Sequence, residues 1–411
     1  MELRVDFVPG GGLESSLVGR LYGDRGGVVW FEYDAAWRAK GIELSPVFLR
    51  LRDAQGVLSS PSRDFGPLFG LFQDALPDWW GERLMRRFFE HSGVPWRRVT
   101  SLQKLACQGR RKTGALTYTP EIEDSDLHAD MAATVEELAT SAEELLQGRT
   151  DGLLDRLVNA GLSPGGAQPK ASLAFNESFT ASMAVDPAPK GYDAWLVKFD
   201  LAPELSAGRL ELAYHRMAAA AGITVPEIRL LESGKGAAHF LSRRFDRGAD
   251  ARRFHIHTFS GLTHTPVRDP MEYGDLLEIA RVLVDGGAAV AEVYRRAVFN
   301  ILAGNDDDHG RNHAFLMDEA GRWSLAPAYD LNPSTNPLSS GWRAGAIGGK
   351  AAGLRRDDLL RFADEHDVRD AEGILRAVEE SVAAWPDHGR AAGVPETKIE
   401  DISRQQPGWG A

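Results

Sequence analysis

Cysteine is the scarcest chemistry-bearing residue in this sequence of 411 residues, because Cys107 is the only one. A single cysteine excludes a disulfide within the chain and any metal site built from several thiolates. No stretch approaches the roughly 18 consecutive apolar residues that a membrane-spanning helix needs. The opening segment, MELRVDFVPGGG, lacks the cationic start and apolar run of a secretory signal. We therefore expect a cytoplasmic protein that makes no membrane contact.

Positive charge is in short supply relative to negative charge. The chain has 47 Lys and Arg against 59 Asp and Glu, which gives a net charge of −12. A protein that coats DNA or RNA needs a positive face, so this balance argues against nucleic-acid binding over the whole surface. A basic cluster at 86–112 is the local exception. We interpret it as a solvated helix face, with contact to DNA or to an acidic substrate as the alternative.

The hydrophobic pattern changes along the chain and predicts several structural units. Short β-branched and aromatic runs separated by glycines come first, followed by an apolar stripe at helical spacing over 69–92. We predict an α+β protein with four segments. They are a β-rich and then helical N-terminal subdomain (1–120), an acidic connecting segment (121–150), a mixed unit with a glycine-rich loop (151–250) and a mostly helical unit (251–405).

The segment NILAGNDDDHGRNHAFLMD carries the strongest chemical signal. A helical stripe ends at Gly304, an acidic loop and a strand follow, and a hairpin returns the chain to Asp330. Asp307 and Asn312 are five residues apart, so the hairpin can bring Asp330 close to both. One carboxylate that accepts a hydroxyl proton, with an amide and a second carboxylate as hard oxygen ligands, is equipment for Mg²⁺-dependent phosphoryl transfer. The alternative is an ordinary acidic loop after a helix C-cap.

The usual phosphate-binding motifs are missing, since neither G-x-G-x-x-G nor G-x-x-x-x-G-K-[ST] occurs. The segment SPGGAQPK, from Ser163 to Lys170, offers small residues through which backbone N–H groups could approach an anion, although it also fits a plain turn. Lys198 lies in the apolar strand WLVKFD, where a lysine is costly unless it meets an anion. A phosphate would be such an anion, with Glu211 as the carboxylate that holds Lys198; the alternative is an edge-strand lysine in solvent.

The strand FLSRRFDR could lead into a linker between two lobes, where the backbone pairs with adenine and Phe245 packs on it. A salt-bridged strand end explains the same residues. His255 and His257 alternate on a strand without a third ligand at useful spacing, so we do not expect a zinc site. We interpret His309 as a hydrogen-bonding residue of the acidic loop. The absence of G-x-S-x-G leaves hydrolase triads without an anchor.

These segments together resemble the HipA family of bacterial Ser/Thr kinases, the toxins of HipBA toxin–antitoxin modules. The similarity extends over nearly the whole chain, and the segments that carry it are DALPDWWGERLM, SPGGAQPKAS, LVKF, ELAYHRMA, RRFDR, NDDDHGRN and AYDLNPS. It implies a bilobal kinase-like fold, similar to HipA and PI3/4 kinases, with a mostly α-helical C-terminal lobe, and it implies ATP and Mg²⁺ as cofactors.

Family roles carry over by position. The resemblance implies that Asp307 is the catalytic base with His309 and Arg311 in its loop, that Asn312 and Asp330 bind Mg²⁺, and that the nucleotide contacts Ser163, Gly165, Gly166, Ala167, Gln168, Lys170, Lys198, Glu211, Arg243 and Phe245. It also implies autophosphorylation of Ser163, which ejects the glycine-rich loop and silences the kinase. Pro164 and Pro169 make this loop stiffer than the family pattern.

The resemblance also implies partners. One is a HipB-type helix-turn-helix antitoxin, through which the acidic chain would reach operator DNA. The other is a protein substrate, for which aminoacyl-tRNA synthetases are the family precedent, and its phosphorylation stops translation and produces dormancy. Two alternatives stay open at this point: a kinase of a lipid or small molecule, and a catalytically weak, pseudokinase-like co-repressor.

Overall fold

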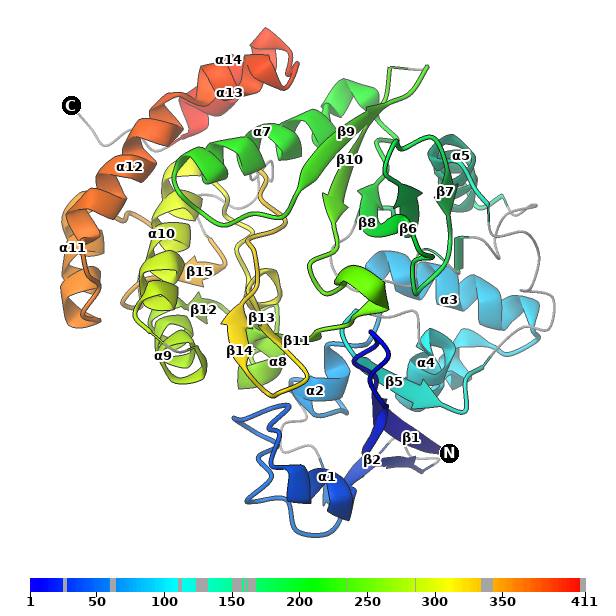
Figure 1. The fold of residues 1–411 in the computed structure, drawn as a ribbon. Helices are drawn as coiled ribbons and strands as arrows, with labels where there is room; N and C mark the ends of the chain where they lie inside the picture. The colour runs from blue at the N-terminus through cyan, green and yellow to red at the C-terminus, as the bar shows by residue number, and fades with distance from the viewer. Residues whose placement is uncertain are drawn as a thin grey trace.

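The structure is a computed structural model whose described part contains three hydrophobic cores. Figure 1 shows how its helices and strands are arranged. The structure describes the whole chain apart from residues 25–27, 60–63, 110–112, 123–131, 150–156, 159, 161–167, 235, 285, 334–342 and 407–411. Among the described residues, no helix is both long enough and apolar enough to span a lipid bilayer.

The N-terminal region is built on an antiparallel sheet with the strand order β4-β3-β2-β1-β5. Its elements are β1 (Glu2–Phe7), β2 (Ser16–Gly23), β3 (Val29–Tyr33), α1 (Ala35–Lys40), β4 (Leu58–Ser59), α2 (Gly70–Gln73), α4 (Ser101–Gln108) and β5 (Leu116–Thr119). Alternating apolar residues such as Leu3 and Val5 are fully buried. The core also includes Met317 from the C-terminal half, so this region does not close upon itself.

The apolar stripe over 69–92 is divided between two helices and does not form one continuous helix. Pro77 follows α2 and disfavours a helical conformation in the residue before it, and α3 (Trp79–His91) begins again from Asp78, whose side chain accepts a hydrogen bond from Gly81 N. α5 (Val135–Leu146) begins in a capping box of Thr134 and Glu137. Both helices share a hydrophobic core with the second sheet rather than with the first. The predicted boundaries at 120 and 150 stay predictions.

The second sheet is antiparallel, with the strand order β7-β6-β8-β10-β9. Its strands are β6 (Lys170–Asn176), β7 (Ser182–Met183), β8 (Tyr192–Lys198), β9 (Ile228–Glu232) and β10 (Ala238–Arg243), and α7 (Ala207–Ala220) packs against β9 and β10. Because β8 is central and covered on both faces, Val197 packs towards α3 and α5 while the next residue, Lys198, lies on the α7 side.

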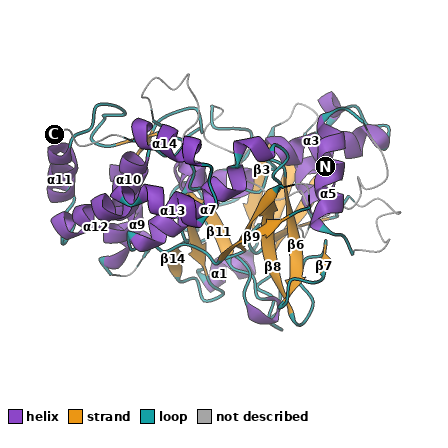
Figure 2. Cartoon of the chain, turned by 90° about the horizontal axis from the view of Figure 1, so that it is seen from above, coloured by secondary structure: helices purple, strands orange, loops and turns teal. Residues whose placement is uncertain are grey.

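The C-terminal region is mostly helical, and its helices lie on the opposite side of the molecule from the second sheet (Figure 2). It contains β11 (His255–Thr258), α8 (Phe259–Thr263), β12 (Met271–Glu272), α9 (Tyr273–Leu283), α10 (Ala288–Ala303), β13 (Ala314–Met317), β14 (Trp323–Leu325), β15 (Gly345–Ala346), α11 (Arg356–Glu365), α12 (Ala371–Ala383), α13 (Trp385–Ala391) and α14 (Glu396–Gln405). Short 3-10 turns occupy η1 (Trp96–Arg98), η2 (Pro203–Leu205), η3 (Ala249–Ala251) and η4 (Gly310–Asn312).

The hairpin of β13 and β14 delivers Asp330 to the cavity. β11, β13 and β14 form one antiparallel sheet, and β14 ends at Leu325, before the chain reaches Asp330. The chain then runs as an extended segment in which Ala326 N donates to Ala314 O at 3.0 Å and Ala328 N donates to Thr224 O at 2.8 Å. The first bond continues the pairing with β13, and the second directs the segment towards the residues that follow α7.

Candidate active site

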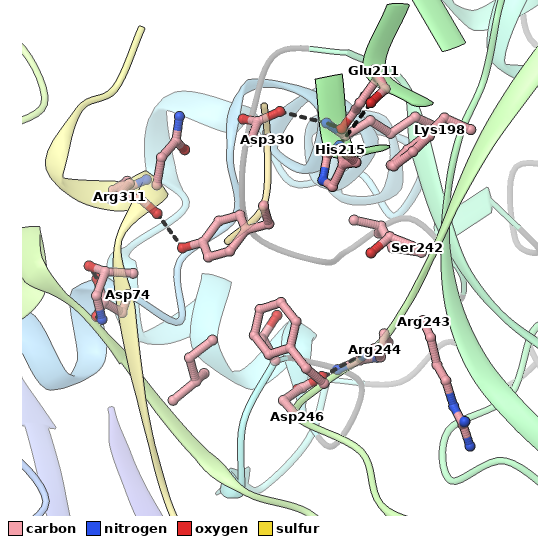
Figure 3. A pocket seen from close by; sticks show the side chains of 18 residues that line it. Asp74, Lys198, Glu211, His215, Ser242, Arg243, Arg244, Asp246, Arg311 and Asp330 are labelled. Atoms are coloured by element: carbon pink, nitrogen blue, oxygen red, sulfur yellow. Dashed lines mark hydrogen bonds and ion pairs between the residues drawn. The ribbon is translucent and has the colours of Figure 1, made fainter. Parts of the chain in front are cut away.

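A cavity lies where the second sheet meets the C-terminal region, and most of the predicted site residues that the structure describes line it (Figure 3). Its lining includes Lys198, Glu211, Arg243, Phe245, Arg311, Asn312 and Asp330 from the sequence prediction, and also Asp74, Thr113, His215 and Tyr329, which the sequence did not single out. Segments more than 250 residues apart in the chain therefore share one cavity wall.

Lys198 sits between two carboxylates. Its Nζ lies 2.6 Å from Oε1 of Glu211 and 2.5 Å from Oδ1 of Asp330 (Figure 3). Burial by itself lowers the pKa of Lys198, but the two carboxylates hold that pKa above its ordinary value. Burial by itself raises the pKa of Asp330, but Lys198 holds it well below its usual range. Lys198 and Asp330 are therefore an ion pair in contact with the cavity.

Glu211 is the most deeply buried member of this group, with a side chain only 3% exposed. Burial raises its pKa to about 7, against the opposing effect of Lys198. Four residues later on the same face of α7, His215 places its Nδ1 2.9 Å from Glu211 O. Helical spacing from Glu211 was a signal that could have identified His215 in the sequence.

Asp307 and Asp308, two of the three consecutive acids of the loop, have different environments. α10 ends at Gly304 in the left-handed conformation, as the sequence predicts. The side chain of Asp307 is 77% exposed, with His309 Nε2 4.0 Å from its Oδ1. Asp308 is fully buried and accepts hydrogen bonds of 2.7 Å from Tyr273 Oη, Arg343 Nη2 and Gly345 N. Only Asp307 of this pair is therefore open to a substrate.

One hydrogen bond lies within the acidic loop, and a second ties the loop to the residue before Asp330. Asn312 Nδ2 donates to Asp307 O at 2.8 Å, and Tyr329 Oη donates to Arg311 O at 2.6 Å. Asp330 itself has a φ of 58°, in the left-handed region. These contacts place Asn312 and Asp330 in the same cavity wall.

The donor chemistry of this wall fits Mg²⁺. The nitrogen of Asn312 is used by Asp307 O, so its oxygen is the atom that could ligate a cation, and Asp330 supplies an ionised carboxylate. Magnesium in phosphoryl-transfer sites is commonly held by one or two such groups together with phosphate oxygens and water. Among the residues that the structure describes, no cluster of three or more His, Cys, Asp or Glu could hold a metal ion.

The end of β10 forms the other side of the cavity. Arg243 and Phe245 line it, and the ring of Phe245 lies 5.5 Å from that of Tyr329. The intervening Arg244 is buried and pairs with Asp246, whose Oδ2 also accepts from Gly114 N at 2.7 Å. The salt-bridged strand end, which was the alternative interpretation of these residues, is therefore present together with the cavity lining.

The glycine-rich segment is described only in part. Ser163, Gly165, Gly166 and Ala167 lie outside the described residues. Gln168 Nε2 donates to Phe199 O at 3.1 Å. Lys170 is opposite Lys198 in the strand register, but its Nζ pairs with Asp78 Oδ2 at 2.7 Å, and Lys170 is not among the cavity-lining residues. Its assignment to nucleotide binding stays a prediction.

The basic cluster contains several residues with structural partners. Arg87 Nη2 donates to Gly148 O at 3.3 Å, beyond the end of α5, and Lys104 forms an ion pair with Glu82. Arg97 and Arg98 are exposed, and residues 110–112 lie outside the described residues. The interpretation as a contact surface for DNA or an acidic substrate stays a hypothesis.

Two protein-family models match the chain. The model described as HipA-like C-terminal domain matches residues 162–385, and the one described as HipA N-terminal domain matches residues 12–119. Together they include Asp74, the acidic loop and the segment of Asp330.

Similar proteins are found in several bacteria. The protein named "Putative kinase Y4dM" of Sinorhizobium fredii is 28% identical over 360 residues, which cover 82% of this chain and 81% of that protein. The protein named "Putative kinase" of Haemophilus influenzae is 26% identical over 191 residues, which cover 42% of this chain and 52% of that protein.

A solved structure is similar over almost the full length. HipA of Shewanella oneidensis MR-1, determined with HipB and its operator DNA, superposes with a TM-score of 0.68 at 19% identity and covers 98% of this chain and 95% of that one. The superposition confirms the predicted α+β fold of the HipA type.

Proposed function

This chain belongs to the HipA family, and we propose on that basis that it is an ATP- and Mg²⁺-dependent protein serine/threonine kinase, the toxin of a HipBA-type toxin–antitoxin module. The observation that carries the proposal is the contact of Lys198 with both Glu211 and Asp330 in a cavity also lined by Asn312. A lysine held by a helix glutamate, beside an aspartate and an asparagine suited to Mg²⁺, is the arrangement that kinases use to hold nucleotide phosphates.

Each residue has a role in the proposed reaction. Lys198 would bind the α- and β-phosphates, Glu211 would orient Lys198, and the end of β10 at Arg243 and Phe245 would hold adenine. Asn312 and Asp330 would hold Mg²⁺, whose chemistry in phosphoryl transfer is to neutralise charge on the phosphate oxygens. His309 and Arg311 would complete the loop around Asp307.

The exposure of Asp307 supports a large substrate. Its carboxylate is 77% exposed, beside a cavity whose ion-pairing groups are buried. A serine or threonine hydroxyl on another protein can reach such a position, and Asp307 would accept its proton while the phosphate bond is broken. Family precedent points to an aminoacyl-tRNA synthetase as the protein substrate and to Ser163 as a site of self-inactivating autophosphorylation.

We propose a HipB-type helix-turn-helix antitoxin as the partner. The solved HipA structure contains HipB and operator DNA. With a net charge of −12 this chain is repelled by DNA, so we expect it to reach an operator mainly through a basic antitoxin.

Transfer of radiolabelled phosphate from ATP tests the proposal. Wild-type protein is incubated with Mg²⁺, ATP and bacterial lysate, and label is measured in protein gels and in lipid extracts. Asp307→Asn should reduce protein labelling by ~10²–10⁴-fold, because the hydroxyl loses its proton acceptor. Asp364→Asn, at an exposed carboxylate on α11, is the matched control and should label normally. Label in the lipid extract alone, or equal labelling by Asp307→Asn, would overturn the proposal.

A further inference from the structure

One wall of the cavity comes from the N-terminal region. Asp74 lies directly after α2, and its side chain, only 8% exposed, reaches the cavity that contains Lys198 and Asp330. Figure 3 shows it on the same side of the cavity as Arg311. No local signal in the sequence indicates this placement, because Asp74 is distant in the chain from the predicted site residues.

Both oxygens of Asp74 accept hydrogen bonds from β11. Thr258 donates its N–H at 2.8 Å and its hydroxyl at 2.7 Å, and His257 Nδ1 lies 2.6 Å from Oδ2. An ionised carboxylate can only accept, so Nδ1 is the protonated nitrogen of His257. Arg311 lines the same cavity as Asp74. Burial by itself raises the pKa of Asp74, but His257 and Arg311 hold that pKa below its ordinary value.

The same strand also binds the N-terminal region farther from the cavity. His257 Nε2 lies 3.0 Å from Ser45 Oγ, and His255 Nε2 lies 3.0 Å from Leu44 O. Ser45, His257 and Asp74 therefore form a hydrogen-bonded chain. Ser45 is 1% exposed and does not line the cavity, so the chain positions groups and does not offer a nucleophile.

Close backbone packing connects Asp74 with the catalytic loop. A Cβ on Gly70 would lie 1.8 Å from Gly261 O, so α2 and α8 approach through two glycines. A Cβ on Gly310 would lie 3.0 Å from the ring of Phe259, which places α8 against η4. α2 therefore packs on α8, and α8 packs on the turn that contains Arg311 and Asn312.

We propose that Asp74 is a positioning residue through which the N-terminal region holds Arg311 and the catalytic loop in their active arrangement. The proposal rests on the proposed kinase function and adds to it that the N-terminal region completes the active site. Asp74 acts through Arg311 by charge and through α8 by packing.

A double-mutant cycle tests the charge coupling in the full-length protein. Asp74→Asn should lower kcat about tenfold with little change in KM for ATP, and it should have little further effect in Arg311→Gln, because both variants break the same coupling. Thr258→Val should show part of the loss, and Thr258→Ser should restore it. Asp6→Asn is the control, since Asp6 is a largely buried carboxylate of the same region that pairs with Arg4.

Hydrogen–deuterium exchange of the nucleotide-free protein supplies a readout that does not need activity. Asp74→Asn should increase deuterium uptake over residues 307–317, whereas Asp6→Asn should not. Two results together would overturn the positioning role. The effects of Asp74→Asn and Arg311→Gln on kcat would multiply in the double variant, and deuterium uptake over 307–317 would be unchanged in Asp74→Asn. If the wild-type protein transfers no phosphate, the kinase proposal fails and the exchange result alone decides the role of Asp74.

Discussion

At the scale of single residues, neighbouring carboxylates with the same chemistry lie in different environments. Asp307 is open to a substrate, whereas Asp308 is enclosed by three donors. Burial by itself raises the pKa of Asp308, but Arg343 and Tyr273 hold it below its ordinary value. The sequence predicted that the acidic run matters, but it could not separate these residues, because Arg343 and Tyr273 meet Asp308 only in the folded chain.

Substitution of Asp308 should therefore affect stability. Asp308→Asn should lower the free energy of unfolding by about 3 kcal/mol, because Arg343 is 5% exposed and would lose its buried partner. Asp307→Asn should change it by less than about 0.5 kcal/mol. Urea denaturation of both variants measures the difference. Equal stability of the two variants would contradict the distinct environments of these acids.

At the scale of elements, the ends of helices follow from local signals, whereas the remaining features depend on long-range packing. Gly304 ends α10 as predicted, since a C-cap depends only on its own backbone. The stripe over 69–92 divides at Pro77, and the chain leaves β13 after Ala326, where Ala328 donates to Thr224 O. The participation of Asp74 could not be predicted, because it depends on how α2 docks against α8.

The turn after β10 contains a buried charge network. This network is larger than the salt-bridged strand end that the sequence suggests. Asp246 accepts from Arg244, from Arg247 at 2.6 Å and from Gly114 N at 2.7 Å, while Arg247 also pairs with Asp186 at 2.6 Å. These contacts connect the second sheet with the segment before β5. Burial by itself raises the pKa of Asp246, but the two arginines hold it well below its usual range.

This network should make stability sensitive to acid. A carboxylate with a lower pKa in the folded state stabilises the protein above its unfolded pKa of about 3.9, and the contribution is lost as pH falls through the folded value. We expect the wild-type free energy of unfolding to fall as pH decreases from about 5 to about 2. Asp246→Asn should be less stable at pH 7 and show a shallower pH dependence, measured by urea denaturation. Parallel curves for the two proteins would contradict this.

At the scale of the whole molecule, the N-terminal region and the C-terminal region are joined as one body. The N-terminal core includes Met317, and Trp323 packs against both cores. His255 and His257, which the sequence left without a function, hold the segment at Leu44 and Ser45.

Thermal unfolding should therefore show a single cooperative transition. The two regions share apolar core and buried hydrogen bonds, so neither can unfold without exposing the other. Differential scanning calorimetry of the full-length protein should give one peak, with a calorimetric enthalpy equal to the van't Hoff enthalpy. Two separate peaks would contradict the shared core.

We propose that Asn312 and Asp330 hold Mg²⁺ beside phosphates bound by Lys198. Calorimetric titration with ATP, with and without Mg²⁺, tests this metal site in wild-type protein, Asp330→Asn and the control Asp364→Asn. We predict that Mg²⁺ tightens ATP binding by tenfold or more, a difference of about 1.4 kcal/mol, in the wild type and the control. Asp330→Asn should lose this dependence. ATP binding that ignores Mg²⁺ in the wild type, or an unchanged dependence in Asp330→Asn, would contradict the account.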